Sequence, residues 1–565
     1  FLLFISNSAS AQQRALASRS DSIDITHTAI NLNIIDFAGK TISGNASINF
    51  KSAMNGINQL DLDLLKLNID SVVMNNQHLS FSYSDSITIH IQLPVTMNVG
   101  DSSVVSVYYH GKPQIDLPSG WGGFYFNGNY AYNLGVGFSN VPHSFGRVWF
   151  PCFDNFVERC GFDFYITCSS TNMAICNGVL ISSIDNGNGT KTFHWQLLQT
   201  IPSYLACVAV APYAPVSYTY NSIDGPIPVY LAALSADTTH MKNSFVNLGT
   251  AIDAFENAWG PYRWNKVGYS LVPFSAGAME HATNISYPQP IANGSTSYQN
   301  IMAHELSHHW FGDLITCDNA GDMWINEGFA TYNESIFLEY MNGYSSYLNN
   351  IRTNHAKVLQ YNHADDSTWL ALSNMPQSYT YGSTTYEKGA DVIHTMRTYM
   401  GDTLFFHCFQ NFLNDYQFQP VNAYTIRDYL NQCSSINMTS FFNDWIFNPG
   451  FPQFSIDSMK STQAGTGYDV QFYVKQRLDH APNYFSNVPL SITFMNDVWD
   501  TATVNILMSN GCGIFNTHLD FQPTFAIVDR FNKISDAETD DEKVIRNSGS
   551  YVFTNGKMNL SVTSL

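Results

Sequence analysis

Hydrophobic and polar residues alternate over most of the chain between residues 22 and 207. At 29–34 and 46–50 every second side chain is apolar, which is the period of a strand with one buried face. Asn-Gly and Gly-Lys pairs separate such runs, as is typical of turns between strands. The pattern predicts an all-β domain over 22–207. Within it, the Gly- and aromatic-rich stretch 120–126 fits packed hairpins better than a binding loop.

From residue 208 to residue 450 the apolar positions follow helical spacing instead. One candidate helix, at 243–259, carries Phe245, Leu248, Ile252 and Phe255 on one side, and a strand-like run follows at 267–272. Further helices are expected at 297–313, 324–342, 345–360, 385–400, 403–416 and 424–433. Strand patterns return at 469–474 and 490–494, after the turn at 448–452, so residues 451–565 are expected to form a β domain.

Composition narrows the class of protein. A chain of 565 residues with 45% hydrophobic residues can bury several cores, so three or four domains are expected. The net charge of −20 argues against nucleic acid and anionic membranes as partners. It mildly favours cationic or amine-bearing ligands, although acidity that only aids solubility explains the charge equally well.

The N-terminal residues resemble the end of a secretory signal peptide. The apolar run 1–5 leads into Ala9-Ser10-Ala11, which fits an A-x-A cleavage site after Ala11. Residues 1–11 are then a signal remnant and 12–21 a polar mature tail. No later run reaches the roughly 18 apolar residues of a membrane span. We therefore expect export to an extracellular or periplasmic location and no integral membrane span.

Nine cysteines are scattered along the chain. Four of them recur every eight residues, and one or two disulfides among them are possible if the compartment is oxidising. These are Cys152, Cys160, Cys168 and Cys176. Cys317 is expected to be a buried, inert thiol.

The candidate chemistry is concentrated in His304-Glu305-Leu306-Ser307-His308. Helical spacing of four puts His304 and His308 on one face, where two imidazoles can bind one Zn²⁺ ion. Glu305 points about 100° away and can act on water without being a ligand. Glu327, at the start of the next predicted helix, supplies a third ligand, and His₂Glu with an open position is typical of catalytic zinc. His309 points elsewhere and is interpreted as structural.

Other candidate residues surround this stretch in the sequence. Glu280 can hold a cationic group of a substrate. The Tyr386 hydroxyl can donate a hydrogen bond to an oxyanion. Glu334, two helical turns after Glu327, is a candidate partner for the N–H of a ligand imidazole. For each of these three, an ordinary surface or core role explains the residue type as well.

Taken together, these residues resemble the M1 family of zinc aminopeptidases, a branch of the gluzincins. Besides the zinc motif, several segments match the family's patterns over about residues 22 to 530. They are Gly277-Ala278-Met279-Glu280, Trp310-Phe311-Gly312, 324–330, Tyr386-Glu387-Lys388-Gly389, Phe150-Pro151-Cys152-Phe153-Asp154 and 445–452.

The resemblance implies a multidomain α+β fold: an N-terminal all-β saddle-like domain, a thermolysin-like, mainly α catalytic domain over 208–450, and a small C-terminal β-sandwich over 451–565. It implies one Zn²⁺ per chain, held by His304, His308 and Glu327, with Glu305 as general base. Tyr386 would stabilise the transition state, and Glu280 would anchor the free α-amine of a peptide. The implied substrate-binding residues are Gly277, Ala278, Met279, Glu280, His281 and, by a weaker match, Tyr381.

Three features depart from the family's pattern. His281 replaces the motif's Asn, and Val-Pro-His-Ser occupies 141–144, where a Gln often precedes the equivalent of Arg147. The family's helical C-terminal domain has no counterpart, which fits a three-domain relative or a sequence cut short.

Three functions therefore stay open at this point. The first is an aminopeptidase in which zinc-activated water attacks the first peptide bond of a peptide with a free N-terminus. The second is a zinc endopeptidase or another amide or epoxide hydrolase. The third is a non-catalytic peptide-binding scaffold, for which loss of Glu305 or Tyr386 would be the signature; both residues are present.

Overall fold

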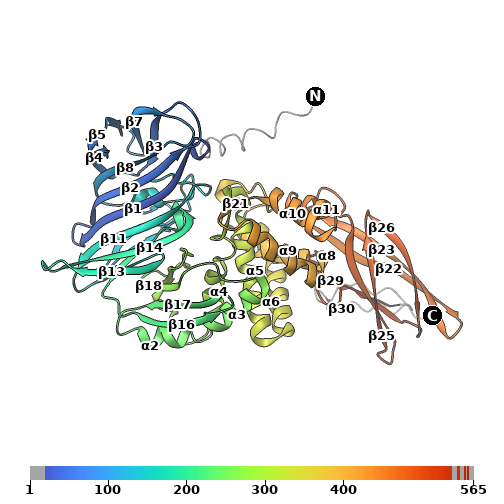
Figure 1. Cartoon of the computed structure of the whole chain (residues 1–565). Helices are drawn as coiled ribbons and strands as arrows, with labels where there is room; N and C mark the ends of the chain where they lie inside the picture. The colour runs from blue at the N-terminus through green and yellow to red at the C-terminus, as the bar shows by residue number, and fades with distance from the viewer. Residues whose placement is uncertain (1–18, 538–543, 547–552, 555–556, 559–565) are drawn as a thin grey trace. The chain divides into compact units, whose positions relative to one another are not determined.

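The structure is a computed structural model that describes residues 19–537, 544–546, 553–554 and 557–558 (Figure 1). Contacts divide the chain into two compact units. Of the described residues, the first unit contains those up to Ala320 together with Leu413–Val421, and the second contains Gly321–Phe412 and those from Asn422 onward. Each unit is described by itself.

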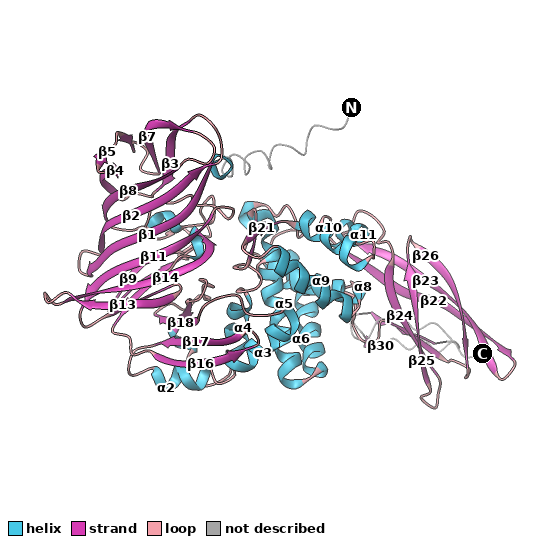
Figure 2. Ribbon diagram, viewed as in Figure 1, coloured by secondary structure: helices cyan, strands magenta, loops and turns pink. Residues whose placement is uncertain are grey.

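The first unit begins with three antiparallel or mixed sheets, in line with the alternating sequence pattern (Figure 2). The largest has eight strands in the order β13 (Val179–Asp185), β14 (Thr190–Pro202), β11 (Arg159–Ser169), β1 (Ile23–Asp36), β2 (Thr41–Ser52), β8 (Ser102–Gly111), β4 (Asn68–Met74) and β5 (Gln77–His78). A three-stranded sheet has the order β3 (Ile57–Asp63), β7 (Thr88–Met97) and β6 (Phe81–Ser82). A four-stranded sheet has the order β12 (Met173–Cys176), β15 (Val208–Ala211), β10 (Tyr130–Leu134) and β9 (Gly123–Asn127).

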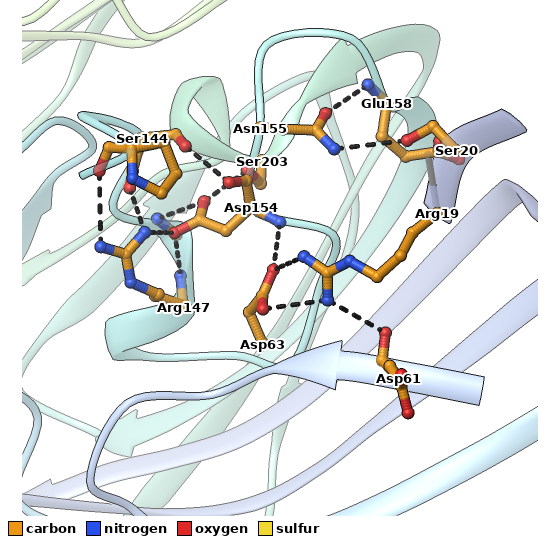
Figure 3. A network of polar contacts seen from close by, with 12 residues as sticks. Arg19, Ser20, Asp61, Asp63, Ser144, Arg147, Asp154, Asn155, Glu158 and Ser203 are labelled. Atoms are coloured by element: carbon orange, nitrogen blue, oxygen red, sulfur yellow. Dashed lines mark hydrogen bonds and ion pairs between the residues drawn. The ribbon is translucent and has the colours of Figure 1, made fainter. Parts of the chain in front are cut away.

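A buried ion-pair network fixes the Phe-Pro-Cys-Phe-Asp segment of this region (Figure 3). Asp154 accepts hydrogen bonds from Ser203 Oγ at 2.6 Å and from Arg147 Nη1 at 2.8 Å. Its backbone N–H donates to Asp63, which also binds both terminal nitrogens of Arg19 at 3.0 and 2.7 Å. Because buried carboxylates are costly unless they are paired, this network explains why an Asp ends the motif.

The rest of the first unit is a mixed sheet with three helices. The sheet order is β16 (Val216–Ser222), β17 (Gly225–Ala232), β18 (Val267–Val272) and β19 (Ile285–Pro288), and the helices are α2 (Thr238–Ser244), α3 (Leu248–Trp259) and α4 (Gln299–Ser307). All six residues of β18 are buried, as expected for a parallel strand between two neighbours. A short parallel pair, β20 (Ile315–Cys317) with β21 (Gln419–Val421), completes the unit.

The second unit has a helical part followed by strands. Its helices are α5 (Glu327–Asn342), α6 (Tyr344–Lys357), α7 (His363–Asp365), α8 (Gly389–Met400), most of α9 (Asp402–Asp415), α10 (Ala423–Ser434) and α11 (Thr439–Phe441). One three-stranded sheet has the order β22 (Phe451–Ala464), β23 (Gly467–Asp479) and β26 (Cys512–Leu519). A four-stranded sheet has the order β25 (Thr501–Met508), β24 (Val488–Met495), β27 (Phe525–Val528) and β28 (Val544–Arg546). A short pair consists of β29 (Phe553–Thr554) and β30 (Lys557–Met558). Phe472 of β23 packs against Phe494 of β24 with ring centroids 5.2 Å apart, so these two sheets share a core.

The predicted order of strands, helices and strands is confirmed, but several details were wrong. The helix predicted at 297–313 ends at Ser307, and the one predicted at 243–259 corresponds to α3, which begins only at Leu248. The region predicted as mainly helical also contains β16, β17 and β19, which the helical spacing did not indicate. These strands are short, and periodicity separates short apolar strands poorly from helix segments.

The cysteine prediction was wrong as well. Cys152, Cys160, Cys168 and Cys176 are all free and buried, and the disulfide joins Cys408 to Cys433. Cys160 and Cys168 lie on the same strand, β11, where eight residues span about 26 Å, far beyond disulfide reach. Cys317 is a buried free thiol, as predicted.

Two predictions on the N-terminus, the signal remnant 1–11 and most of the tail 12–21, lie outside the described residues. Among the residues that the structure describes, no helix combines the length and apolar character needed to cross a membrane.

Candidate metal centre

The two histidines of the zinc motif lie at the C-terminal end of α4. His308 follows the last helical residue but keeps helical dihedral angles, φ −57° and ψ −27°, so the early end of α4 does not change its face. The imidazole centroids of His304 and His308 are 5.0 Å apart. His308 Nδ1 lies 3.0 Å from the carbonyl oxygen of Phe311 and therefore carries the proton, so Nε2 is the nitrogen whose lone pair suits a metal.

The contact between His308 Nδ1 and Phe311 O forms because the chain turns sharply at Gly312. The φ angle there is +128°, and a Cβ atom would lie 2.9 Å from His308 Nδ1. A residue with a side chain would be strained at this position, and its Cβ would collide with the imidazole of His308. Trp310-Phe311-Gly312 thus orients His308.

The third predicted ligand, Glu327, is the buried first residue of α5. One ligand atom from each of His304, His308 and Glu327 lies within 4.8 Å of the others. Two imidazoles and a carboxylate are the donor set of catalytic zinc sites with one open position. The side chains present therefore fit the metal that the sequence predicts.

A second group of ligand atoms within 4.8 Å of one another consists of Glu280, Glu305 and His308. It shares His308 with the first group but offers two carboxylates and only one imidazole, a poorer match to zinc. Glu280 and Glu305 are both buried, so two acidic side chains lie close together beside the His₂Glu group. One carboxylate of such a pair can bind a cation while the other transfers a proton.

Glu280 reaches this position on an extended segment. The Met279 N–H donates to Ser286 O at 3.0 Å and the Ser286 N–H to Met279 O at 2.9 Å, so Met279 pairs with β19. Gly277 has a φ of +91°, and Ala278 is half-buried between it and Met279. The turn at Gly277 and the pairing of Met279 with β19 therefore fix the backbone that carries Glu280.

His281, which replaces the motif's Asn, is fully buried. Its Nε2 lies 3.4 Å from Asn133 Nδ2, which can only donate, so Nδ1 carries the proton toward Ser286 Oγ at 3.2 Å. Burial lowers the pKa of His281 to about 3, and the ring is neutral. These contacts give His281 a role in packing, and a contact with substrate stays a prediction.

His309 is structural, as predicted. Its Nε2 accepts the N–H of Thr283 at 3.2 Å, and its Nδ1 lies 2.8 Å from the Tyr262 hydroxyl. That hydroxyl donates to Lys266 O at 2.7 Å. Burial, followed by the neighbouring His308, lowers the pKa of His309 to about 3, so the ring is neutral.

The predicted oxyanion donor, Tyr386, lies in the second unit on a π-helical turn, Thr384–Lys388, that leads into α8. This turn packs closely on the start of α5. A Cβ atom on Gly389 would lie 2.9 Å from Gly328 Cα, and one on Gly328 would lie 3.2 Å from Thr385 O. The glycines after Glu327 and after Lys388 therefore let the two backbones touch.

The remaining predicted residues, Tyr381 and Glu334, are both half-buried in the second unit. Tyr381 precedes the π-helical turn, and Glu334 lies on α5 two turns after Glu327. The roles predicted for them, and those of the other candidate residues, stay predictions.

Sequence reasoning missed the residues that orient the site from a distance. Asn133 contacts His281 across 148 positions, and Asn177 Nδ2 donates to Ala282 O at 2.6 Å across 105 positions. Both lie in the N-terminal β region, which thus holds the segment after Glu280 in place. A single Asn carries no pattern in the sequence, so nothing there indicated these contacts.

Two family models match the chain. The one described as Peptidase M1 N-terminal domain matches residues 26–205, and the one described as Peptidase family M1 domain matches residues 245–445. The chain belongs to peptidase family M1. The match to the M1 domain includes the whole His₂Glu group.

Relatives named as aminopeptidases are distant in sequence. Aminopeptidase B of Rattus norvegicus is 26% identical, over 55% of this chain and 49% of its own length. Leucine aminopeptidase 2 of Vanderwaltozyma polyspora is 24% identical, over 77% of this chain and 67% of its own. The chain thus spans about half of the first and two thirds of the second.

The fold is that of solved M1 structures. A crystal structure of an M1 zinc metallopeptidase from Deinococcus radiodurans matches with a TM-score of 0.66 and 19% identity, covering 75% of this chain and 93% of that one. A crystal structure of Legionella pneumophila aminopeptidase A matches with a TM-score of 0.74 and 16% identity, covering 91% of this chain and 59% of that one. The N-terminal all-β domain, the helical domain and the C-terminal strands of this chain therefore follow the M1 architecture.

Proposed function

We propose that the protein is a zinc-dependent aminopeptidase that removes residues from the free N-terminus of peptides. The family match, the His₂Glu donor group and relatives named as aminopeptidases support this function. The observation that carries it is the pair of buried carboxylates, Glu280 and Glu305, with oxygen atoms within 4.8 Å of each other.

The spacing of this pair suits a substrate whose ammonium group lies next to its reacting carbonyl. The α-nitrogen and the first carbonyl carbon of a peptide are two bonds apart, about 2.5 Å. A carboxylate that holds the ammonium must therefore lie close to the group that acts on the carbonyl. Glu280 meets this condition relative to Glu305, and its negative charge matches the ammonium.

The residues then have distinct roles. His304, His308 and Glu327 hold zinc, which when bound acts as a Lewis acid and makes water more acidic. Glu280 binds the α-ammonium and sets the register of the peptide. Glu305 accepts a proton from the attacking water and passes it to the leaving amine. Tyr386 donates a hydrogen bond to the oxyanion that develops on the carbonyl oxygen.

Acetylating the substrate tests this function. A peptide with a free N-terminus should be cleaved at its first bond, with kcat/KM roughly 10- to 100-fold above that of its N-acetylated twin, because acetylation removes the charge that Glu280 binds. Mass spectrometry of the products identifies the bond. Equal rates, or cleavage at internal bonds of both peptides, would point to an endopeptidase instead.

The Glu280→Gln variant is the matched control for that experiment. It keeps the size of the side chain but loses the charge, so the preference for the free N-terminus should largely disappear. A variant that keeps the full preference would show that another group binds the amine.

We also propose that the protein is exported. The apolar stretch before Ala11 and the disulfide between Cys408 and Cys433 support this location, because disulfides persist mainly in oxidising compartments. N-terminal sequencing of the protein from the extracellular or periplasmic fraction should find a chain that begins at Gln12. Recovery only inside the cytoplasm, with the leader intact, would contradict export.

A further inference from the structure

A buried carboxylate, Asp366, contacts the turn that carries Tyr386. Its side chain is in the core of the second unit, with 2% of the residue exposed. One oxygen, Oδ2, accepts the N–H of Thr384 at 2.7 Å, and the other, Oδ1, accepts the N–H of Ser383 at 3.1 Å. Both carboxylate oxygens thus bind consecutive backbone N–H groups.

These N–H groups stand at the start of the π-helical turn Thr384–Lys388. The first N–H groups of a helix have no partner within it, and a carboxylate there forms strong, charge-assisted hydrogen bonds. Asn362 Nδ2 also donates to Ser383 O at 3.0 Å. The start of the turn is therefore fixed two residues before Tyr386.

The chain leaves room for this contact at Gly382. A Cβ atom there would lie 2.3 Å from Asp366 Oδ1. The backbone N–H groups of Thr385 and Tyr386 point back to Gly382 O, at 3.0 and 3.4 Å. Gly382 thus leaves space for the Asp366 carboxylate and also accepts the backbone N–H of Tyr386.

We propose that Asp366 is a positioning residue for Tyr386: its carboxylate binds the start of the π-helical turn and thereby sets where the Tyr386 hydroxyl points. The inference rests on the proposed function, in which that hydroxyl binds the oxyanion. An oxyanion donor acts only within hydrogen-bond distance, and a displacement of about 1 Å can lower a rate about 100-fold. Asn at position 366 keeps one acceptor but turns its amide N–H₂ toward the other N–H donor.

The test is a double-mutant cycle on kcat with a peptide of free N-terminus. Asp366→Asn should lower kcat about 10- to 100-fold and change KM by less than about threefold, since substrate binding does not depend on the oxyanion donor. In a Tyr386→Phe background the same substitution should change kcat by less than about twofold, because the hydroxyl that it positions is already absent. A loss of kcat that is equally large in both backgrounds would overturn the inference.

Asp365→Asn is the matched control. Asp365 is exposed, and its Oδ2 atom accepts a hydrogen bond from a side chain, Ser383 Oγ at 3.0 Å. This variant should keep the kcat of the wild type. A loss equal to that of Asp366→Asn would mean that any charge change near the turn is sufficient, and would overturn the specific role of Asp366.

Gly382→Ala covers the case in which Asp366→Asn does not fold, which thermal unfolding will reveal. It retains the carboxylate but displaces it, so it should lower kcat about 10-fold in the wild type and little in Tyr386→Phe. Wild-type kcat in Gly382→Ala would contradict the proposal. If Tyr386→Phe keeps full kcat, the role proposed for Tyr386 fails. If Tyr386→Phe loses activity while the Asp366 and Gly382 variants are fully active, the positioning role of Asp366 alone fails.

Discussion

Replacing Glu305 with Gln should lower kcat by about 10²- to 10⁴-fold while the protein keeps its zinc. Gln has the shape of Glu but cannot accept the proton of the attacking water. The His₂Glu donor group does not include Glu305, so its ligand atoms stay in place. Steady-state kinetics on a free peptide, together with metal analysis of the purified variant, measures both quantities.

The same variant should not be less stable than the wild type. Glu280 and Glu305 are buried with oxygen atoms within 4.8 Å of each other, and two like charges at this distance oppose folding. Neutralising one removes this repulsion, so the free energy of unfolding should stay equal or rise. Active sites often carry this kind of cost because function requires the arrangement.

Glu256→Gln provides the comparison for Glu305→Gln. Glu256 is another buried carboxylate of the first unit, and it accepts hydrogen bonds from the N–H groups of Ile223 and Tyr262 at 3.2 and 3.0 Å. Its replacement should reduce stability and leave kcat within about twofold, because it binds backbone rather than substrate. If Glu305→Gln lost zinc, Glu305 would be a ligand and not the base.

The two histidines of the His₂Glu group could be predicted from the sequence because their geometry is local. A spacing of four residues on a helix places His304 and His308 together whatever the rest of the fold does. The predicted helix extends six residues past the observed end of α4, yet the two rings lie side by side with centroids 5.0 Å apart, since His308 has helical dihedral angles beyond that end. Errors in element boundaries therefore matter little for ligands one turn apart.

What the sequence could not indicate depends on long-range packing. Asp366 meets the turn of Tyr386 only because α7 and the π-helical turn come together in the second unit. Cys408 can bond to Cys433 because α9 and α10 place their Cα atoms 5.8 Å apart. The eight-residue spacing of the cysteines between 152 and 176 corresponds to no disulfide. Such pairs leave no period or motif in a single sequence.

Gly389→Ala should destabilise the second unit, although Gly→Ala in a helix ordinarily stabilises by about 1 kcal/mol. Gly389 has helical angles, with φ −54°, so the backbone itself would accept Ala. The added Cβ, however, would lie 2.9 Å from Gly328 Cα, a backbone atom that cannot move alone. We expect the free energy of unfolding to fall by about 1–3 kcal/mol, the usual cost of overpacking.

The activity of this variant should fall further than its stability suggests. The turn that contains Tyr386 and the helix that begins with Glu327 meet at Gly389 and Gly328, so pushing them apart separates the proposed oxyanion donor from a proposed metal ligand. We expect kcat to drop about 100-fold at temperatures where the variant is fully folded. Urea unfolding and steady-state kinetics on the same preparation separate the two effects.

Gly401→Ala distinguishes this contact from a general effect of removing a glycine. Gly401 ends the same helix with φ +72°, and a Cβ there would meet nothing within 4 Å. The substitution should cost about 1 kcal/mol of stability through backbone strain alone and leave kcat unchanged. If Gly389→Ala behaved in the same way, with reduced stability and full kcat, the close contact between the two backbones would serve folding only, and Tyr386 would not depend on it for its position.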